Sequence, residues 1–90
     1  MFYVYILHLK KVDKLYTGYT SNLKKRTEEH IRNKVLSTKY KDPVLIHYEC
    51  YKIKSDASRR EKFLKTTEGK RLLRQQIKDL LKEIVYSGIV

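Results

Sequence analysis

The sequence predicts an α+β fold, a small three-stranded antiparallel sheet with flanking helices in the order ββαβαα. Residues 2–9 (FYVYILHL) are apolar at both alternating sets of positions and rich in strand formers, which is typical of a central strand covered on both faces. Two further strand-like stretches follow at residues 15–19 and 44–51. Apolar residues recur at helical spacing over residues 73–84, which predicts a helix packed on the sheet.

The first two strands are expected to form a hairpin over residues 2–19. The polar stretch KKVDK breaks the apolar pattern after residue 9, and LYTGY resumes it. A helix should follow, because three successive residues are favoured N-caps: Thr20, Ser21 and Asn22. We expect this helix to end near Asn33, after a narrow apolar stripe formed by Leu23, Thr27 and Ile31.

The rest of the chain predicts a loop, a strand and two helices. Residues 34–43 are polar, and the third strand should place four residues on one half-buried face: Val44, Ile46, Tyr48 and Cys50. Ser55 or Asp56 would cap the second helix, and Gly69 is expected to interrupt the helical region because glycine is a poor helix former. The last helix carries an apolar stripe of Leu73, Ile77, Leu80, Leu81 and Ile84.

Residues 1–90 are expected to form a single domain, with a frayed tail at residues 85–90. A chain this short buries only about two-thirds of its unfolded surface, which allows one modest core. We expect no membrane span and no signal peptide, because no apolar run is long enough and the start lacks the charge pattern of a leader. The single cysteine, Cys50, excludes an intrachain disulfide and favours the reducing cytoplasm.

The chain is strongly basic, with 21 Lys and Arg residues against 10 Asp and Glu and a net charge of +11. Such a field attracts polyanions, nucleic acid first and an acidic membrane surface second. The alternative is a basic surface that only keeps the protein soluble. Charge therefore narrows the class of partner without assigning an activity.

Polar residues gather where the second strand passes into the first helix. Tyr16 and Gly18 end the strand, and the missing Cβ of glycine permits close approach of backbone or a ligand. Residues at three- and four-residue spacing share one edge of the helix, and here they are Asn22, Arg26, Glu29 or His30, and Asn33. Because arginine binds phosphate through a planar, permanently charged fork, this junction can gather a phenol, a guanidinium and an imidazole around one small anion.

Each of these residues also has a structural explanation. A tyrosine in a strand is ordinary sheet packing, and a lone arginine or histidine on a helix is more often structural than catalytic. Glu61 can pair with Arg60 or Lys65 on its own helix. It lies at the margin of the apolar face, however, where a partly desolvated carboxylate is a candidate metal ligand. The histidines at positions 8, 30 and 47 do not have the spacing of a structural zinc site.

Taken together, these motifs resemble the GIY-YIG nuclease domain. Tyr3-Val4-Tyr5 matches the first motif and Tyr16-Thr17-Gly18 the second, and the polar residues that follow fall at the expected intervals. The stretches STKYKDPVLIHYE and SRREKFLKTTEGKRLL extend the resemblance over nearly the whole chain, to small stand-alone bacterial members that are similar to the N-terminal domain of the excision-repair nuclease subunit. Two positions depart from the family pattern: Tyr3 stands where the family name has glycine, and Tyr19 where some members carry an active-site lysine.

The resemblance implies a metal-dependent endonuclease that hydrolyses phosphodiester bonds in DNA, with a place in DNA repair or recombination. In this interpretation Arg26 binds the scissile phosphate, Glu61 holds one Mg²⁺ or Mn²⁺ ion, and Tyr5 or Tyr16 is the general base. His30 would relay the proton or orient a tyrosine. The residues expected to contact nucleic acid are Tyr19, Asn22, Lys24, Lys25, Lys34, Lys39 and Lys41.

Two other hypotheses stay open. The fold can hold nucleic acid without cutting it, or the chain can be a basic RNA- or ribosome-associated protein whose tyrosines stack on bases. No arginine-rich reading head or zinc finger is present, so sequence preference should be weak. Specificity would then come from a homodimer, a protein partner or the structure of the DNA.

Overall fold

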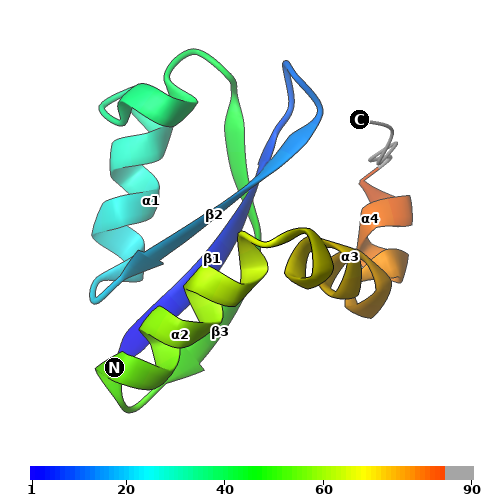
Figure 1. Cartoon of the computed structure of the whole chain (residues 1–90). Helices are drawn as coiled ribbons and strands as arrows, with labels where there is room; N and C mark the ends of the chain where they lie inside the picture. Colours follow the sequence, from blue (N-terminus) through cyan, green and yellow to red (C-terminus); the bar gives the residue numbers. More distant parts are fainter. Residues whose placement is uncertain (85–90) are drawn as a thin grey trace.

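The computed structural model describes residues 1–84, and in them an antiparallel sheet has the strand order β2-β1-β3 (Figure 1). β1 (Phe2–Leu9) lies in the centre, between β2 (Lys14–Thr20) and β3 (Pro43–Tyr51). The prediction of a three-stranded antiparallel sheet with residues 2–9 in its centre is confirmed. The frayed tail expected at residues 85–90 lies outside the described residues.

Helices cover both faces of this sheet. α1 (Leu23–Ile31) follows β2, and a short 3₁₀ helix, η1 (Leu36–Thr38), lies in the connection to β3. After β3 come α2 (Lys54–Leu64), α3 (Thr67–Gln76) and α4 (Lys78–Glu83). Figure 1 shows α1 on one side of the sheet and α2, α3 and α4 on the other. The predicted order ββαβαα is confirmed, with the last helix divided at Ile77, whose φ of −108° and ψ of 27° lie outside the helical range.

β1 contributes to both layers of the core because its side chains alternate between the two faces. On the side of α2 the core is formed by Val4, Ile6, Ala57, Leu64, Leu73, Ile77 and Leu81. On the side of α1 it is formed by Tyr5, Leu7 and Leu9, with Tyr16, Leu23 and Leu45 packed against them. The two-sided apolar pattern of residues 2–9 therefore reflects real burial on both faces, as predicted.

β3 departs from the predicted alternation because its pairing with β1 shifts at one point. Ile6 pairs with His47 but Leu7 pairs with Leu45, so Ile46 is the extra residue of a β-bulge. The extra residue of a bulge shifts the alternation by one position, so residues that an unbroken alternation would place on one face lie on different faces before and after the bulge. The position of a bulge cannot be read from the alternation of apolar residues along the sequence. The expectation of one half-buried face is therefore wrong, and three of its four residues are exposed: Val44, Tyr48 and Cys50.

The boundary between α2 and α3 also differs from the prediction. α2 begins at Lys54, before Ser55 and Asp56. The helical region is interrupted at Thr66, which caps α3: its side-chain oxygen accepts a hydrogen bond from the backbone nitrogen of Gly69. Gly69 itself lies inside the first turn of α3. A Cβ on Gly69 would lie 1.9 Å from the carbonyl oxygen of Phe63, so glycine is needed here for the close approach of the two helices.

Candidate active site

Four of the predicted catalytic residues meet on the α1 side of the sheet. Tyr5 comes from β1, Tyr16 from the neighbouring β2, and Arg26 and His30 from α1. The ring of His30 meets the rings of Tyr5 and Tyr16 edge to face, with centroids 5.6 and 5.3 Å apart. The four-residue spacing of Arg26 and His30 puts both on the helix edge that faces these strands, as the sequence predicted.

Gly18 makes room for the ring of Tyr5. The two residues are cross-strand partners, and a Cβ on Gly18 would lie 2.2 Å from Cζ of Tyr5 and 2.3 Å from its hydroxyl. No other residue fits at this position without displacing the ring. The close approach expected at Gly18 is therefore made by the Tyr5 phenol.

A chain of hydrogen bonds runs through the site from α1 to the 3₁₀ helix. Arg26 Nε donates to the Tyr5 hydroxyl over 3.4 Å, this hydroxyl lies 2.8 Å from His30 Nε2, and His30 Nδ1 lies 2.7 Å from Thr38 Oγ1. Since Arg26 can only donate, the Tyr5 oxygen accepts this hydrogen bond. Both ring nitrogens of His30 are thus bonded to a hydroxyl group, and the tautomer of the ring decides which group donates in each bond.

The electrostatics of the site keep both His30 and Tyr5 neutral. Burial, followed by the charge of Arg26, lowers the pKa of His30 from 6.5 to about 4. Burial raises the pKa of Tyr5 above its ordinary value, although the hydrogen bond and charge of Arg26 act in the opposite direction. Hydrogen bonds to Tyr5 and Glu29 raise the pKa of Arg26, so its positive charge is permanent. One fixed cation therefore stands beside two neutral proton carriers.

The depressed pKa of His30 predicts a pH-dependent stability. Between pH 6.5 and about 4 the unfolded chain binds a proton at His30 that the folded protein does not, so stability is lost as the pH falls through this window. The free energy of unfolding should drop by roughly 3 kcal/mol from this residue alone. NMR titration of the His30 ring in the folded protein checks this, and a midpoint near 6.5 would contradict the buried, neutral state.

Arg26 is held by groups on both sides of its guanidinium. Its Nη1 donates to Glu29 Oε1 over 3.2 Å, while Nε donates to Tyr5, and its side chain is 37% exposed. The guanidinium is thus fixed in direction at one end and still open to solvent. Because the guanidinium is open to solvent, a phosphate oxygen can reach it and accept charge-assisted hydrogen bonds from it.

Glu61 lies on the other face of the sheet from these four residues. It lies on α2, its side chain is 22% exposed, and its carboxylate pairs with Lys65 over 3.2 Å. Arg60, the other partner considered from the sequence, pairs with Glu49 over 2.9 Å. The charge of Glu61 raises the pKa of Tyr5 only slightly, and its effect is smaller than those of burial, Arg26 and Tyr16. Glu61 is thus coupled to the cluster electrostatically and is not one of the residues hydrogen-bonded within it.

The side chains that could bind a metal ion near this site suit a weakly held divalent ion better than an ion enclosed by protein ligands. Within residues 1–84, no group of three or more His, Cys, Asp or Glu side chains could hold a metal ion. Mg²⁺ is commonly bound through one or two carboxylates, with water and substrate phosphate completing its shell. Glu61, a half-buried carboxylate, has the chemistry for this mode.

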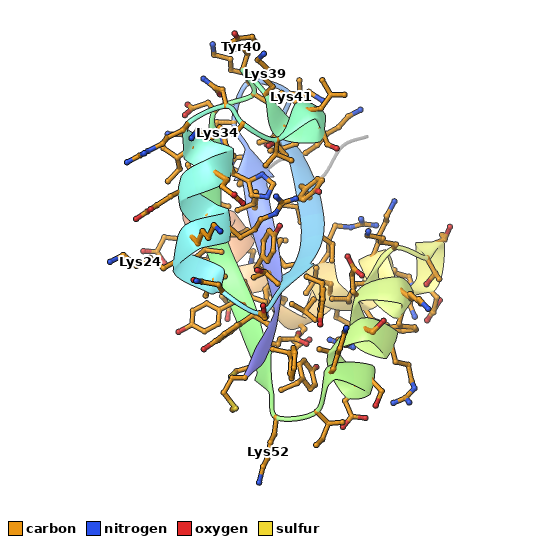
Figure 2. All side chains as sticks on the ribbon, turned by 90° about the vertical axis from the view of Figure 1, so that its left-hand side faces the viewer. Lys24, Lys34, Lys39, Tyr40, Lys41 and Lys52 are labelled. Carbon is orange, nitrogen blue, oxygen red and sulfur yellow. The ribbon has the colours of Figure 1, made fainter. Side chains whose placement is uncertain are left out.

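The residues expected to bind nucleic acid divide into two groups. The lysines are on the surface of α1 and of the connection that follows it, and Figure 2 shows Lys24, Lys34, Lys39 and Lys41 spread over this side of the molecule. Lys25 is exposed on the same helix. Asn22 instead caps α1, since its Oδ1 accepts from the backbone nitrogen of Lys25. Tyr19 stacks on Phe2 at the α2 side, so packing accounts for it, and its contact with nucleic acid stays a prediction.

Thr38 is the site residue that sequence reasoning missed. Its side chain is fully buried, as is that of His30, and it closes the hydrogen-bond chain from within the 3₁₀ helix. The sequence places Thr38 in a polar loop, where nothing distinguishes a buried hydroxyl from an exposed one. Only the folding of the connection onto α1 brings the two residues together.

Comparison with known proteins gives a consistent result. The family model named GIY-YIG catalytic domain, which describes the sequences of that family, matches residues 1–75 of this chain. A UPF0213 protein of Haloquadratum walsbyi is 37% identical over 82 residues, which cover 87% of this chain and 91% of the relative. UPF0213 proteins of Staphylococcus haemolyticus and Clostridium perfringens are 44% and 42% identical, over 71% and 72% of this chain and 79% and 71% of the relatives. No solved structure gives a significant match. None of the helices within residues 1–84 has the length and apolar character needed to span a bilayer.

Proposed function

Because this chain belongs to the GIY-YIG family of nucleases, we propose that it is a metal-dependent endonuclease that hydrolyses phosphodiester bonds, in DNA in preference to RNA. The observation that carries the proposal is the bonded chain from Arg26 through Tyr5 to His30. It combines a fixed positive charge, which phosphate binding needs, with groups that hold and move protons. A purely structural cluster would not need a partly exposed cation beside two titratable groups.

Arg26 is the residue that would receive the scissile phosphate. Hydrolysis builds charge on the phosphoryl oxygens, and a guanidinium that is already oriented stabilises this charge without having to reorganise. The bonds to Tyr5 and Glu29 provide that orientation. Glu61 would hold the divalent ion, whose charge would neutralise the phosphate oxygens further when it is bound.

Tyr16 is the better candidate for the general base. Tyr5 is 1% exposed, its oxygen is engaged by both Arg26 and His30, and burial raises its pKa. Tyr16 is only partly buried and can meet a water on the substrate side. A free phenol has a pKa near 10, so a tyrosine base needs positive charge nearby, and Arg26 and the bound ion would supply it. In this assignment Tyr5 positions Arg26 and His30.

Phenylalanine variants separate these two roles. Tyr16→Phe is expected to reduce the cleavage rate on the order of 10²-fold or more without changing stability, because only an accessible hydroxyl is lost. Tyr5→Phe leaves the buried His30 nitrogen without its partner, so it should lower the free energy of unfolding by about 1–3 kcal/mol as well as slow cleavage. Single-turnover cleavage of plasmid DNA and urea denaturation of both variants measure these effects. A full rate for Tyr16→Phe with a folded but inactive Tyr5→Phe would reverse the assignment.

The lysines around α1 would grip the phosphates that flank the cleaved bond. Such binding is mostly electrostatic, falls steeply with salt and reads little sequence. We therefore propose that DNA structure, a second copy of the chain or a protein partner sets specificity, that the enzyme acts in DNA repair or recombination, and that it works in the cytoplasm. The rival hypothesis, a domain that binds nucleic acid without cutting it, shares the lysines and differs in needing neither Glu61 nor the accessible phenol.

A further inference from the structure

The connection between α1 and β3 is bent by residues in an unusual backbone conformation. Asn33, Tyr40 and Asp42 have φ angles of 60°, 63° and 55°, in the left-handed region. For Tyr40, a bulky residue, this conformation is a genuine outlier that persists only where surrounding contacts maintain it. Asn33 Oδ1 accepts a hydrogen bond from the Tyr40 backbone nitrogen over 3.1 Å, and the β1–β2 turn donates from Lys10 to the carbonyl oxygen of Asp42 over 3.2 Å.

This conformation presents the ring of Tyr40 to solvent. The residue is 66% exposed and lies at the end of the molecule, where Figure 2 shows it above Lys39 and Lys41. The ammonium group of Lys39 lies 5.1 Å from the centre of the ring, at a distance typical of a cation–π contact. An exposed aromatic ring among lysines is the arrangement by which proteins bind unpaired nucleic acid, since the ring stacks on a base while the cations bind phosphates.

A hollow lies directly beside the ring. Its volume is about 230 Å³, and it is lined by Lys11, Ile31, Asn33, Tyr40, Asp42 and Pro43. Tyr40 and Ile31, which is 59% exposed, provide apolar walls, while Lys11 is a cation at the rim. Asn33 and Asp42 add side-chain groups that can bond to the edge of a base. We call this site the Tyr40 hollow.

We propose that the Tyr40 hollow binds an unpaired base of the nucleic acid, with Tyr40 as its stacking platform. The inference rests on the proposed function and specifies its substrate class: strands with unpaired bases, such as single-stranded flaps and branched junctions, in preference to blunt duplex. A base paired inside a duplex cannot offer its face to Tyr40, because its neighbours on both sides already stack on it. An apolar wall also has nothing to gain from phosphate alone, which separates this site from the lysines.

The same connection carries a residue of the catalytic chain. Thr38, two residues before Tyr40, is fully buried and bonded to His30, and the Lys41 backbone nitrogen donates to the Thr38 carbonyl oxygen over 3.1 Å. The connection that carries Tyr40 thus also supplies Thr38 to the hydrogen-bond chain of the active site. A base held in the hollow therefore contacts the same connection that is bonded to His30 through Thr38.

Binding measured in EDTA tests this without relying on cleavage. Fluorescence anisotropy compares a labelled blunt duplex with the same duplex bearing a single-stranded extension. Tyr40→Ala is expected to weaken binding of the extended DNA about 5- to 150-fold, as loss of one stacked base does, and to change binding of the blunt duplex less than about twofold. Tyr40→Phe keeps the ring and should bind both DNAs as the parent protein does. Tyr48→Ala, which removes an exposed tyrosine from β3, is the matched control and should change neither.

A second readout detects stacking itself. A 2-aminopurine base in the extension should lose fluorescence on binding to the parent protein and to Tyr40→Phe, but not on binding to Tyr40→Ala at saturation. The inference would be overturned if the parent protein and Tyr40→Ala bound the extended DNA equally well. Full quenching of 2-aminopurine by Tyr40→Ala would also overturn it. If the parent protein never cuts DNA yet shows the Tyr40-dependent preference, the nuclease proposal fails and the binding site stands.

Discussion

Glu61→Gln is expected to abolish metal-dependent cleavage, with a loss on the order of 10³-fold or more in rate. The change keeps the size of the side chain and removes the charge by which a carboxylate holds a divalent ion, whose contribution to phosphoryl chemistry is several kcal/mol. DNA affinity should stay equal or rise slightly, because a negative charge near the phosphate disappears. Single-turnover cleavage in Mg²⁺ and Mn²⁺, with binding measured separately, checks both parts.

The fold should survive this substitution. Glu61 is partly exposed and its pair with Lys65 is an i,i+4 surface contact, worth about 0.3–0.5 kcal/mol. Asp56→Asn is the matched control, since it removes the same charge from the same helix at an exposed pair with Arg59. Normal cleavage by Glu61→Gln would contradict the assignment of Glu61 as the metal ligand, and the carboxylate would then be an ordinary surface charge.

Arg26→Ala is expected to reduce cleavage roughly 10³-fold while weakening DNA binding only modestly. A preorganised cation at the phosphoryl group is worth about this much in related chemistry, whereas one phosphate contact among several contributes little to affinity. The substitution also removes the charge that helps to depress the pKa of His30, so that pKa should rise. Cleavage rates and the His30 NMR titration measure the two consequences in one variant.

Two companion variants interpret the loss. Arg26→Lys keeps the charge but not the planar fork, so it should recover only part of the rate. Arg59→Ala removes an equal charge from an exposed position on α2 and should cleave normally. If Arg26→Ala and Arg59→Ala behave alike, Arg26 is a solvated helix residue and the phosphate site lies elsewhere.

The fold could be predicted largely because local patterns and long-range packing agree in this chain. Residues 2–9 are apolar on both faces, and a central strand between two layers of helix is the arrangement that buries both faces. The structure shows this arrangement. The errors lie where packing overrides local pattern. A bulge at Ile46 reverses the face of β3, and Gly69 is required by the close approach of α2 and α3 rather than by a helix break.

The site could be predicted only in part. Spacing along one helix is enough to align Arg26 with His30, and the strand that ends before that helix brings Tyr16 to them. The partner of Tyr5 could not be found in this way, because its bond to His30 spans 25 residues and depends on how α1 lies on the sheet. Thr38 and the left-handed Tyr40 lie in a connection without periodicity, where only tertiary contacts decide which side chains are buried.

The most direct test of the central claim is cleavage by the parent protein itself. Supercoiled plasmid and a branched oligonucleotide junction would be incubated with Mg²⁺, with Mn²⁺ and with EDTA, beside Glu61→Gln prepared in the same way. We expect nicked or linear plasmid and cut junction with either metal, none in EDTA, and none from the variant. Salt-sensitive binding of both DNAs without cleavage in any metal would contradict the account and identify the chain as a binding domain on a nuclease fold.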